Sequence, residues 1–341
     1  MKGEPIPGSN AWLAQIQEDI VDPLRPIIDP HHHLWTNTFG HDYLLEDLWA
    51  DTNSGHNILK TVYVECRAFY RQQGPEHLQP VGETEAVRDF AERSRNGRPR
   101  QATIAGIVAH ADLRLGATPE ILDDLLREHQ EASGGLLRGI RHSGAHDKQP
   151  EQLLITGRAP SYLYGKEEFR AGLRLLPHYG LTYDAWHFHH QNEDFCELAR
   201  AVPETTMVLD HFGTPLGVGI YSGRQDDIFQ HWKKDIIELA KCENVVMKLG
   251  GLAMPDNGFG WDKAARPPGS DEFVTAQRHY YEHVLEHFGA QRCMFESNFP
   301  VDRLSLSYHV LWNGFKKMVA GCSESEKQAL FHDTAARIYR L

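Results

Sequence analysis

The chain has 341 residues, 41% of them hydrophobic, and carries a formal net charge of −12 from 47 acidic and 35 basic residues. This acidic balance excludes a typical nucleic-acid-binding protein, and no run of about 18 apolar residues predicts a membrane span. Five scattered cysteines without a CxxC pair, and no signal-peptide pattern, predict a cytoplasmic protein without a disulfide framework or a cysteine zinc site.

Eight short apolar runs alternate with longer amphipathic segments along the chain, as buried parallel strands alternate with helices. The expected strands are Pro26–His33, Thr61–Cys66, Thr103–His110, Leu136–His142, Leu181–His189, Thr206–His211, Val245–Gly250 and Arg292–Asn298. Eight repeats predict an α/β protein with one (β/α)8 TIM barrel domain over residues 1–341. Residues 1–25 would form an N-terminal extension and residues 303–341 would hold C-terminal helices. An open doubly wound sheet is the alternative, but no glycine-rich phosphate loop supports it.

Helical patterns fill most of the gaps between these runs. The expected helices are Glu83–Arg95, Thr118–Ala132, Asn192–Val202, Asp226–Cys242, Asp271–Phe288, Leu311–Val319 and Glu324–Tyr339. Thr118 is a candidate N-cap before Pro119, and Ser323 with Glu326 has the spacing of a capping box. Long loops are expected at 36–60, 142–168, 213–225 and 252–270. All four follow a strand, and the loops after barrel strands form the active face of such enzymes.

The strongest local signal is the DPHHHLW segment at the end of the first strand. Alternation along a strand predicts that Asp29, His31 and His33 share one face while His32 points the other way. Two imidazoles two residues apart and facing the barrel axis can bind one divalent ion or hold a substrate oxygen. This pair is therefore the predicted catalytic centre.

Histidine recurs at the ends of other expected strands, and these ends converge in a barrel. His189 ends the fifth run, His211 the sixth and His142 the fourth. His189 and His211 are predicted catalytic residues, and His142 is a weaker candidate for binding substrate. The eighth run ends in ESNFP, which places Asn298 at the same end of the barrel.

The stretches IIDPHHHLW, GIRHS, YDAWHFHHQ, LDHFGTPLG, VVMKLGG and MFESNFPVD follow in this order between residues 27 and 302. Together they resemble the amidohydrolase-related group that includes aldonolactonases, the pyrone-dicarboxylate lactonase and related decarboxylases. The resemblance implies a (β/α)8 barrel and hydrolysis of a lactone or similar carbonyl compound. It assigns His31 and His33 to the group's first-strand pair, and His189 and His211 to its fifth- and sixth-strand histidines.

One residue departs from the group's pattern. The eighth-strand motif usually carries an Asp that deprotonates the attacking water and often ligates metal. Here the residue is Asn298, which cannot accept a proton at neutral pH. Either another carboxylate, namely Glu65, Asp302 or Glu296, serves as the base, or the reaction needs none at this position.

The same departure leaves the cofactor open. His31, His33 and His211 could hold a divalent ion, Zn²⁺ or Mn²⁺, although an asparagine carbonyl is a weak zinc ligand. Some members of the group bind substrate with the same histidines and no metal. Both a metal site and a metal-free site therefore remain as expectations.

Several further residues are candidates for binding the substrate. Arg141 ends the fourth strand, and its planar guanidinium suits a substrate carboxylate. Arg67 and Lys248 are weaker candidates of the same kind. The aromatic residues expected to line an apolar pocket are Trp35, Tyr43 and Trp186.

Three functions are weighed on this basis. The first is a lactonase-like hydrolase acting on a small substrate that could carry a carboxylate. The second is a non-hydrolytic lyase, such as a decarboxylase or hydratase, on the same barrel. The third is a barrel that has lost catalysis and only binds a ligand. The expected partner is a small molecule, without nucleic acid or membrane, and association into a homo-oligomer is left open.

Overall fold

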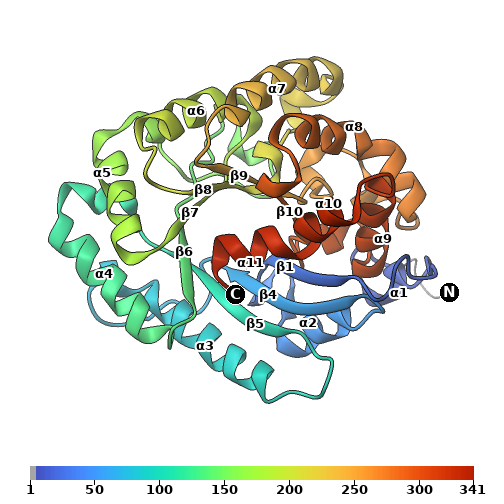
Figure 1. The fold of residues 1–341 in the computed structure, drawn as a ribbon, viewed down its shortest axis with the longest axis horizontal. Helices are drawn as coiled ribbons and strands as arrows, with labels where there is room; N and C mark the ends of the chain where they lie inside the picture. The colour runs from blue at the N-terminus through green and yellow to red at the C-terminus, as the bar shows by residue number, and fades with distance from the viewer. Residues whose placement is uncertain (1–4) are drawn as a thin grey trace.

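Eight parallel strands form a barrel in the computed structural model, which describes residues 5–341 (Figure 1). The barrel strands, in their order around the sheet, are β1 (Pro26–His32), β4 (Asn57–Val64), β5 (Thr103–His110), β6 (Leu137–Arg141), β7 (Thr182–Ala185), β8 (Met207–Leu209), β9 (Val245–Leu249) and β10 (Cys293–Phe295). Each predicted apolar run contributes one strand. The (β/α)8 prediction is therefore confirmed.

The barrel closes between its last and first strands through the segment that follows β10. The His33 N–H donates to the Phe299 carbonyl at 2.8 Å, and the Asn298 N–H donates to the His31 carbonyl at 3.0 Å. These bonds lie at the carboxyl ends of the strands. Closure thus joins the first-strand histidines directly to the segment that carries Asn298.

Helices surround the barrel (Figure 1). They are α1 (Asn10–Leu13), α2 (Leu45–Thr52), α3 (Val81–Arg95), α4 (Pro119–Ala132), α5 (Glu167–Leu175), α6 (Asn192–Ala201), α7 (Gln225–Ala240), α8 (Ser270–Phe288), α9 (Tyr308–Met318), α10 (Glu324–Gln328) and α11 (Thr334–Tyr339). In α4 the buried Leu122, Leu125, Leu126 and His129 recur at helical spacing, so one stripe packs against the barrel. No helix within residues 5–341 is long and apolar enough to cross a membrane.

The final helix closes the end of the barrel opposite the loops that follow the strands. Apolar side chains inside the barrel form one cluster with the last residues of the chain: Ile28, Val62, Val64, Val108, Val208, Val246, Met294, Ala335, Ile338 and Tyr339. Valine dominates this layer because β-branched side chains fill the interior of a small barrel well. The site must therefore open at the other end.

Several predicted boundaries need correction. The expected loop 36–60 holds an antiparallel hairpin, β2 (Trp35–Thr38) with β3 (His41–Tyr43), followed by α2. Helix α5 begins at the end of the expected loop 142–168 and continues through a stretch for which the sequence predicted no helix. Thr118 occupies the N-cap position of α4 as predicted, but its hydroxyl donates to the Leu115 carbonyl and makes no capping hydrogen bond. The Ser323–Glu326 capping box is confirmed, but a π turn at Ala329–Asp333 interrupts the helix that follows it.

Candidate active site

The two first-strand histidines meet inside the barrel. The His31 and His33 Nε2 atoms lie 3.2 Å apart, and both side chains are buried. Alternation predicted that Asp29 shares their face, but it does not. The register of β1 is irregular between Asp29 and His32. Its carboxylate instead accepts hydrogen bonds from the Ser297 N–H and the Tyr308 hydroxyl.

Glu296 lies at the centre of the site, although the sequence made it only a weak candidate. One of its oxygens lies 2.7 Å from His31 Nδ1 and the other 2.6 Å from His211 Nδ1. Burial raises the pKa of Glu296, but the adjacent His211 and His31 outweigh burial and hold it at about 2. The carboxylate is therefore ionised and fixes two imidazole rings.

These contacts also determine the tautomers of the three histidines. His33 Nδ1 lies 2.8 Å from the Val64 carbonyl, which can only accept, so Nδ1 carries the proton. In His31 and His211, Nδ1 faces the ionised Glu296 and donates to it. Burial keeps the pKa of His31 and of His33 well below the usual range, so both rings are neutral. His31 and His33 therefore each leave Nε2 with a free lone pair.

This donor set fits a divalent metal ion. Lone pairs on two nitrogens 3.2 Å apart repel each other unless a cation lies between them. Two nitrogen ligands about 2.0–2.1 Å from a tetrahedral zinc would lie roughly 3.3 Å apart, close to the observed separation. Ligand histidines commonly donate their other N–H to a carboxylate or carbonyl, as these three do. A different group of potential ligands shares two of these histidines, because ligand atoms of His31, His211 and Glu296 lie within 4.8 Å of one another.

A buried ionic cluster supports the histidines from below. Lys248 Nζ lies 2.8 Å from Asp184, 3.0 Å from Asp210 and 3.3 Å from His31 Nδ1. Burial lowers the pKa of Lys248, but the adjacent Asp184 and Asp210 raise it by a larger amount. The ammonium therefore stays charged. Lys248, predicted as a substrate-binding residue, is fully buried and lies outside the lining of the cavity. Neither aspartate is among the predicted site residues, although Asp210 follows Val208 on the inward face by simple alternation.

Asn298 lies beside the histidines with its backbone at φ 54°. Its Nδ2 donates to Asp302 Oδ1 at 2.9 Å, and the other Asp302 oxygen accepts from the Ala253 N–H at 3.2 Å. Burial raises the pKa of Asp302 to about 7. Asn298 lines the cavity and Asp302 lies behind it, so Asp302 holds the amide and does not face a substrate.

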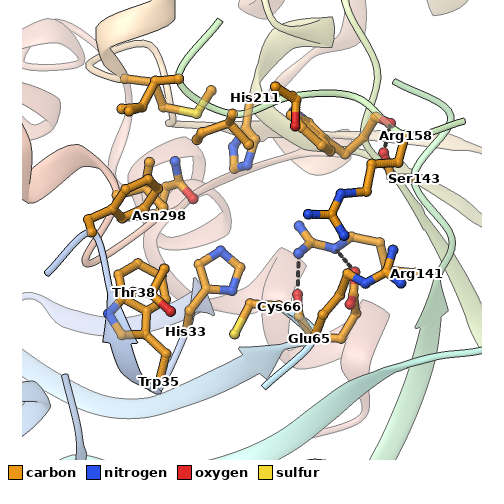
Figure 2. Close-up of a pocket in the computed structure, with 18 residues that line it drawn as sticks. His33, Trp35, Thr38, Glu65, Cys66, Arg141, Ser143, Arg158, His211 and Asn298 are labelled. Atoms are coloured by element: carbon orange, nitrogen blue, oxygen red, sulfur yellow. Dashed lines mark hydrogen bonds and ion pairs between the residues drawn. The ribbon is translucent and has the colours of Figure 1, made fainter. Parts of the chain in front are cut away.

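A cavity of about 300 Å³ opens above these groups, a size suited to a small molecule (Figure 2). His33, His211 and Asn298 form its polar floor. Its apolar walls are Trp35, Phe39, Leu154, Ile155, Trp186, Met254 and Val301. Its remaining polar lining is Thr38, Glu65, Cys66, Arg67, Arg141, Ser143, Thr156 and Arg158. Three of the four predicted long loops therefore contribute to the cavity, all except 213–225.

Arg141 lies on the side of the cavity opposite His33 and Asn298 (Figure 2). Its Nε donates to Glu65 Oε1 at 2.9 Å, a second nitrogen donates to the Glu65 carbonyl, and a third lies 3.6 Å from Asp210. Glu65 lines the cavity as predicted, but its carboxylate is already paired. Both side chains are nearly buried, so they form a fixed wall of the cavity.

Three predicted site residues lie elsewhere. His189 is absent from the lining and accepts a hydrogen bond from the Leu216 N–H, because β7 ends at Ala185 and strand alternation no longer applies. The Tyr43 hydroxyl donates to Asp51 on α2, away from the cavity. His142 lines an adjoining cavity of about 630 Å³ instead.

Residues 28–341 match the amidohydrolase family. The protein y4mH of Sinorhizobium fredii is 34% identical, over 92% of this chain and 98% of its own length. An L-fucono-1,5-lactonase of Burkholderia multivorans is 27% identical, over 92% of this chain and 96% of its own. A solved amidohydrolase of Burkholderia multivorans with bound HEPES has a TM-score of 0.70 at 25% identity, over 92% and 99% of the two chains. A second crystal form with bound zinc has the same TM-score at 24% identity, with the same coverage.

Proposed function

The chain belongs to the amidohydrolase family, and from this premise we propose that it hydrolyses a lactone at the centre formed by His31, His33 and His211. The observation that carries the proposal is the close approach of two imidazole nitrogens, His31 Nε2 and His33 Nε2 at 3.2 Å, beside a small cavity that His33 and His211 line. Ring opening of a lactone needs a polarised carbonyl and an attacking water, and it releases one acid per turnover. The cavity provides room for one small ring above the floor.

His31, His33 and His211 would hold a divalent ion, which would polarise the carbonyl and lower the pKa of a water molecule. An all-nitrogen set without a carboxylate ligand favours Zn²⁺ over Mn²⁺. Glu296 orients two of the three rings through their Nδ1–H groups. Lys248 balances the charge beneath them.

Asn298 orients the attacking water in this proposal. Because its Nδ2 is bound to Asp302, its carbonyl oxygen is the atom left to accept a hydrogen bond in the cavity. The amide can position a water O–H but cannot take its proton. Trp35 and the other apolar walls enclose the ring and restrict access of bulk water.

We also propose that the protein acts in the reducing cytosol on a small molecule. All five cysteines are free, and Cys196 and Cys242 have their sulfur atoms 4.0 Å apart. Association into a homo-oligomer stays a prediction of the sequence.

The test is a pH-stat screen of the purified protein on five- and six-membered sugar lactones and on lactones that carry a carboxylate. With at least one of these classes of lactone, we expect acid to be released at least 100-fold faster than in buffer without the protein. His33→Asn should lower kcat/KM by at least 100-fold, because it removes a floor nitrogen. His231→Asn, on the exposed face of α7, is the matched control and should keep full activity.

Thermal unfolding of both variants separates lost chemistry from lost structure. If the folded protein opens none of these lactones, the proposed function is wrong. It is equally wrong if His33→Asn and His231→Asn retain the same activity.

A further inference from the structure

The cavity is cationic in an acidic protein. Three of its lining residues, Arg67, Arg141 and Arg158, carry guanidinium groups, and Glu65 is the one carboxylate among the residues that line it. Glu65 is paired with Arg141, so these two charges balance. Two positive charges remain, although the whole chain has a net charge of −12.

Arg67 and Arg158 are free to bind a ligand. Within residues 5–341, no carboxylate oxygen lies within 4.0 Å of either guanidinium, whereas the third arginine of the cavity, Arg141, is paired with Glu65. Both side chains are exposed at the mouth of the cavity. Arg67 has its backbone at φ 65°, a conformation that costs a non-glycine residue energy and is concentrated at functional sites.

The two arginines come from different segments that meet at the site. Arg67 follows β4, and Arg158 belongs to the long segment after β6. Both also line the adjoining cavity of about 630 Å³, so they lie where the two cavities meet. Figure 2 shows Arg158 on the same side as Arg141 and across the cavity from His33 and Asn298.

We infer that the substrate is a lactone bearing a carboxylate, which Arg67 and Arg158 bind while its ring carbonyl faces His33 and Asn298. The inference rests on the proposed lactonase function and adds the substrate class to it. Guanidinium groups match carboxylates in a planar, two-pronged geometry. Because Arg158 lies across the cavity from His33 and Asn298, the carboxylate must be on a ring atom or side chain away from the reacting carbonyl.

The experiment compares a carboxylated δ-lactone with the same lactone in which a primary amide replaces the carboxylate. The two have nearly the same size and differ in charge. The wild-type protein should prefer the carboxylate by at least tenfold in kcat/KM. In the double variant Arg67→Gln/Arg158→Gln, kcat/KM for the carboxylated lactone should fall at least tenfold, mainly through a higher KM. The kcat/KM for the amide lactone should change by less than twofold.

The matched control is Arg93→Gln, which removes an exposed arginine outside this cavity. Equal use of both lactones by the wild type, or equal losses on both in the double variant, would overturn the inference and leave the lactonase function intact. If neither lactone is opened, the pH-stat screen of the wider lactone panel decides the proposed function, and calorimetric binding of the carboxylated lactone decides the inference. Binding weakened at least tenfold in the double variant supports it, and unchanged binding overturns it.

Discussion

Asn298 and Asp302 form a matched pair in which an amide donates to a buried carboxylate. Restoring the family's usual residue with Asn298→Asp would place two carboxylates in contact, and both cannot ionise together. We expect this variant to lose more than about 1 kcal/mol of unfolding free energy at pH 8, comparable to an unsatisfied buried polar group. The swap Asn298→Asp/Asp302→Asn restores one donor and one acceptor and should recover most of that loss.

Urea denaturation of the wild type, the single variant and the swap measures this coupling. Strictly additive effects of the two substitutions would show that the pair does not interact as described.

Asp302 also predicts how stability depends on pH. Its pKa of about 7 in the folded protein lies above the unfolded value of about 3.9, so the folded state binds the proton more tightly. Its stabilising contribution is complete below about pH 4 and is lost as the pH rises through about 7. Relative to Asp302→Asn, the unfolding free energy of the wild type should fall by on the order of 4 kcal/mol between pH 4 and pH 8. A difference in unfolding free energy that stays constant over this range would contradict the assignment.

For single residues, the sequence predicted positions best at the carboxyl ends of the barrel strands. His31, His33, His211 and Asn298 all lie at the site, because each lies at or just after the end of a barrel strand. His189 was misplaced because its strand ends four residues earlier. Side-chain ion pairs between different strands cannot be predicted from the sequence alone, so the Arg141–Glu65 pair was missed.

Among the elements, the loop after β9 depends on a close approach of its backbone to a catalytic ring. A Cβ on Gly251 would lie 2.2 Å from His211 Nδ1, the atom that contacts Glu296. Gly251→Ala should displace the ring and lower kcat/KM by about 100-fold, the cost expected for a misplacement of about 1 Å. Gly260 has the same φ of 73° and no atom within 4 Å, so Gly260→Ala controls for backbone strain. Equal activities of the two variants would contradict the steric explanation.

The sequence predicted the elements well where apolar periodicity was strong, as in β5, whose bounds it matched. It missed the β2–β3 hairpin and α2 within an expected loop, because short polar elements have little periodicity of their own. The lining of the cavity comes largely from such segments. This is why Arg158 could not be recognised as a site residue before the segment after β6 was placed.

For the molecule as a whole, a zinc centre formed by the histidines predicts the metal content. The wild type should retain about one zinc per chain after dialysis, measured by elemental analysis, and His31→Asn should lose it. A second group of potential ligands, His283, Glu286 and His287, lies on α8 at the surface, so His287→Asn is a necessary control. If His287→Asn lowers the zinc content and His31→Asn does not, the zinc belongs to the surface group and the metal assignment at the barrel centre is wrong.

The barrel could be predicted from the sequence because eight alternating runs admit few topologies, and the family resemblance followed the same order. The substrate could not, because it depends on side chains from separate loops and on which charges are left unpaired once the chain has folded. Arg67 and Arg158 become informative only when every other nearby charge has been assigned a partner.

The most direct test of lactone hydrolysis at this centre is turnover in ¹⁸O-labelled water, with the product analysed by mass spectrometry. If the centre at His31, His33 and His211 hydrolyses a lactone, each turnover should place one ¹⁸O atom in the product carboxylate. His33→Asn should abolish this incorporation. Product formed without the label, or with release of carbon dioxide, would contradict the account and indicate a lyase on the same barrel.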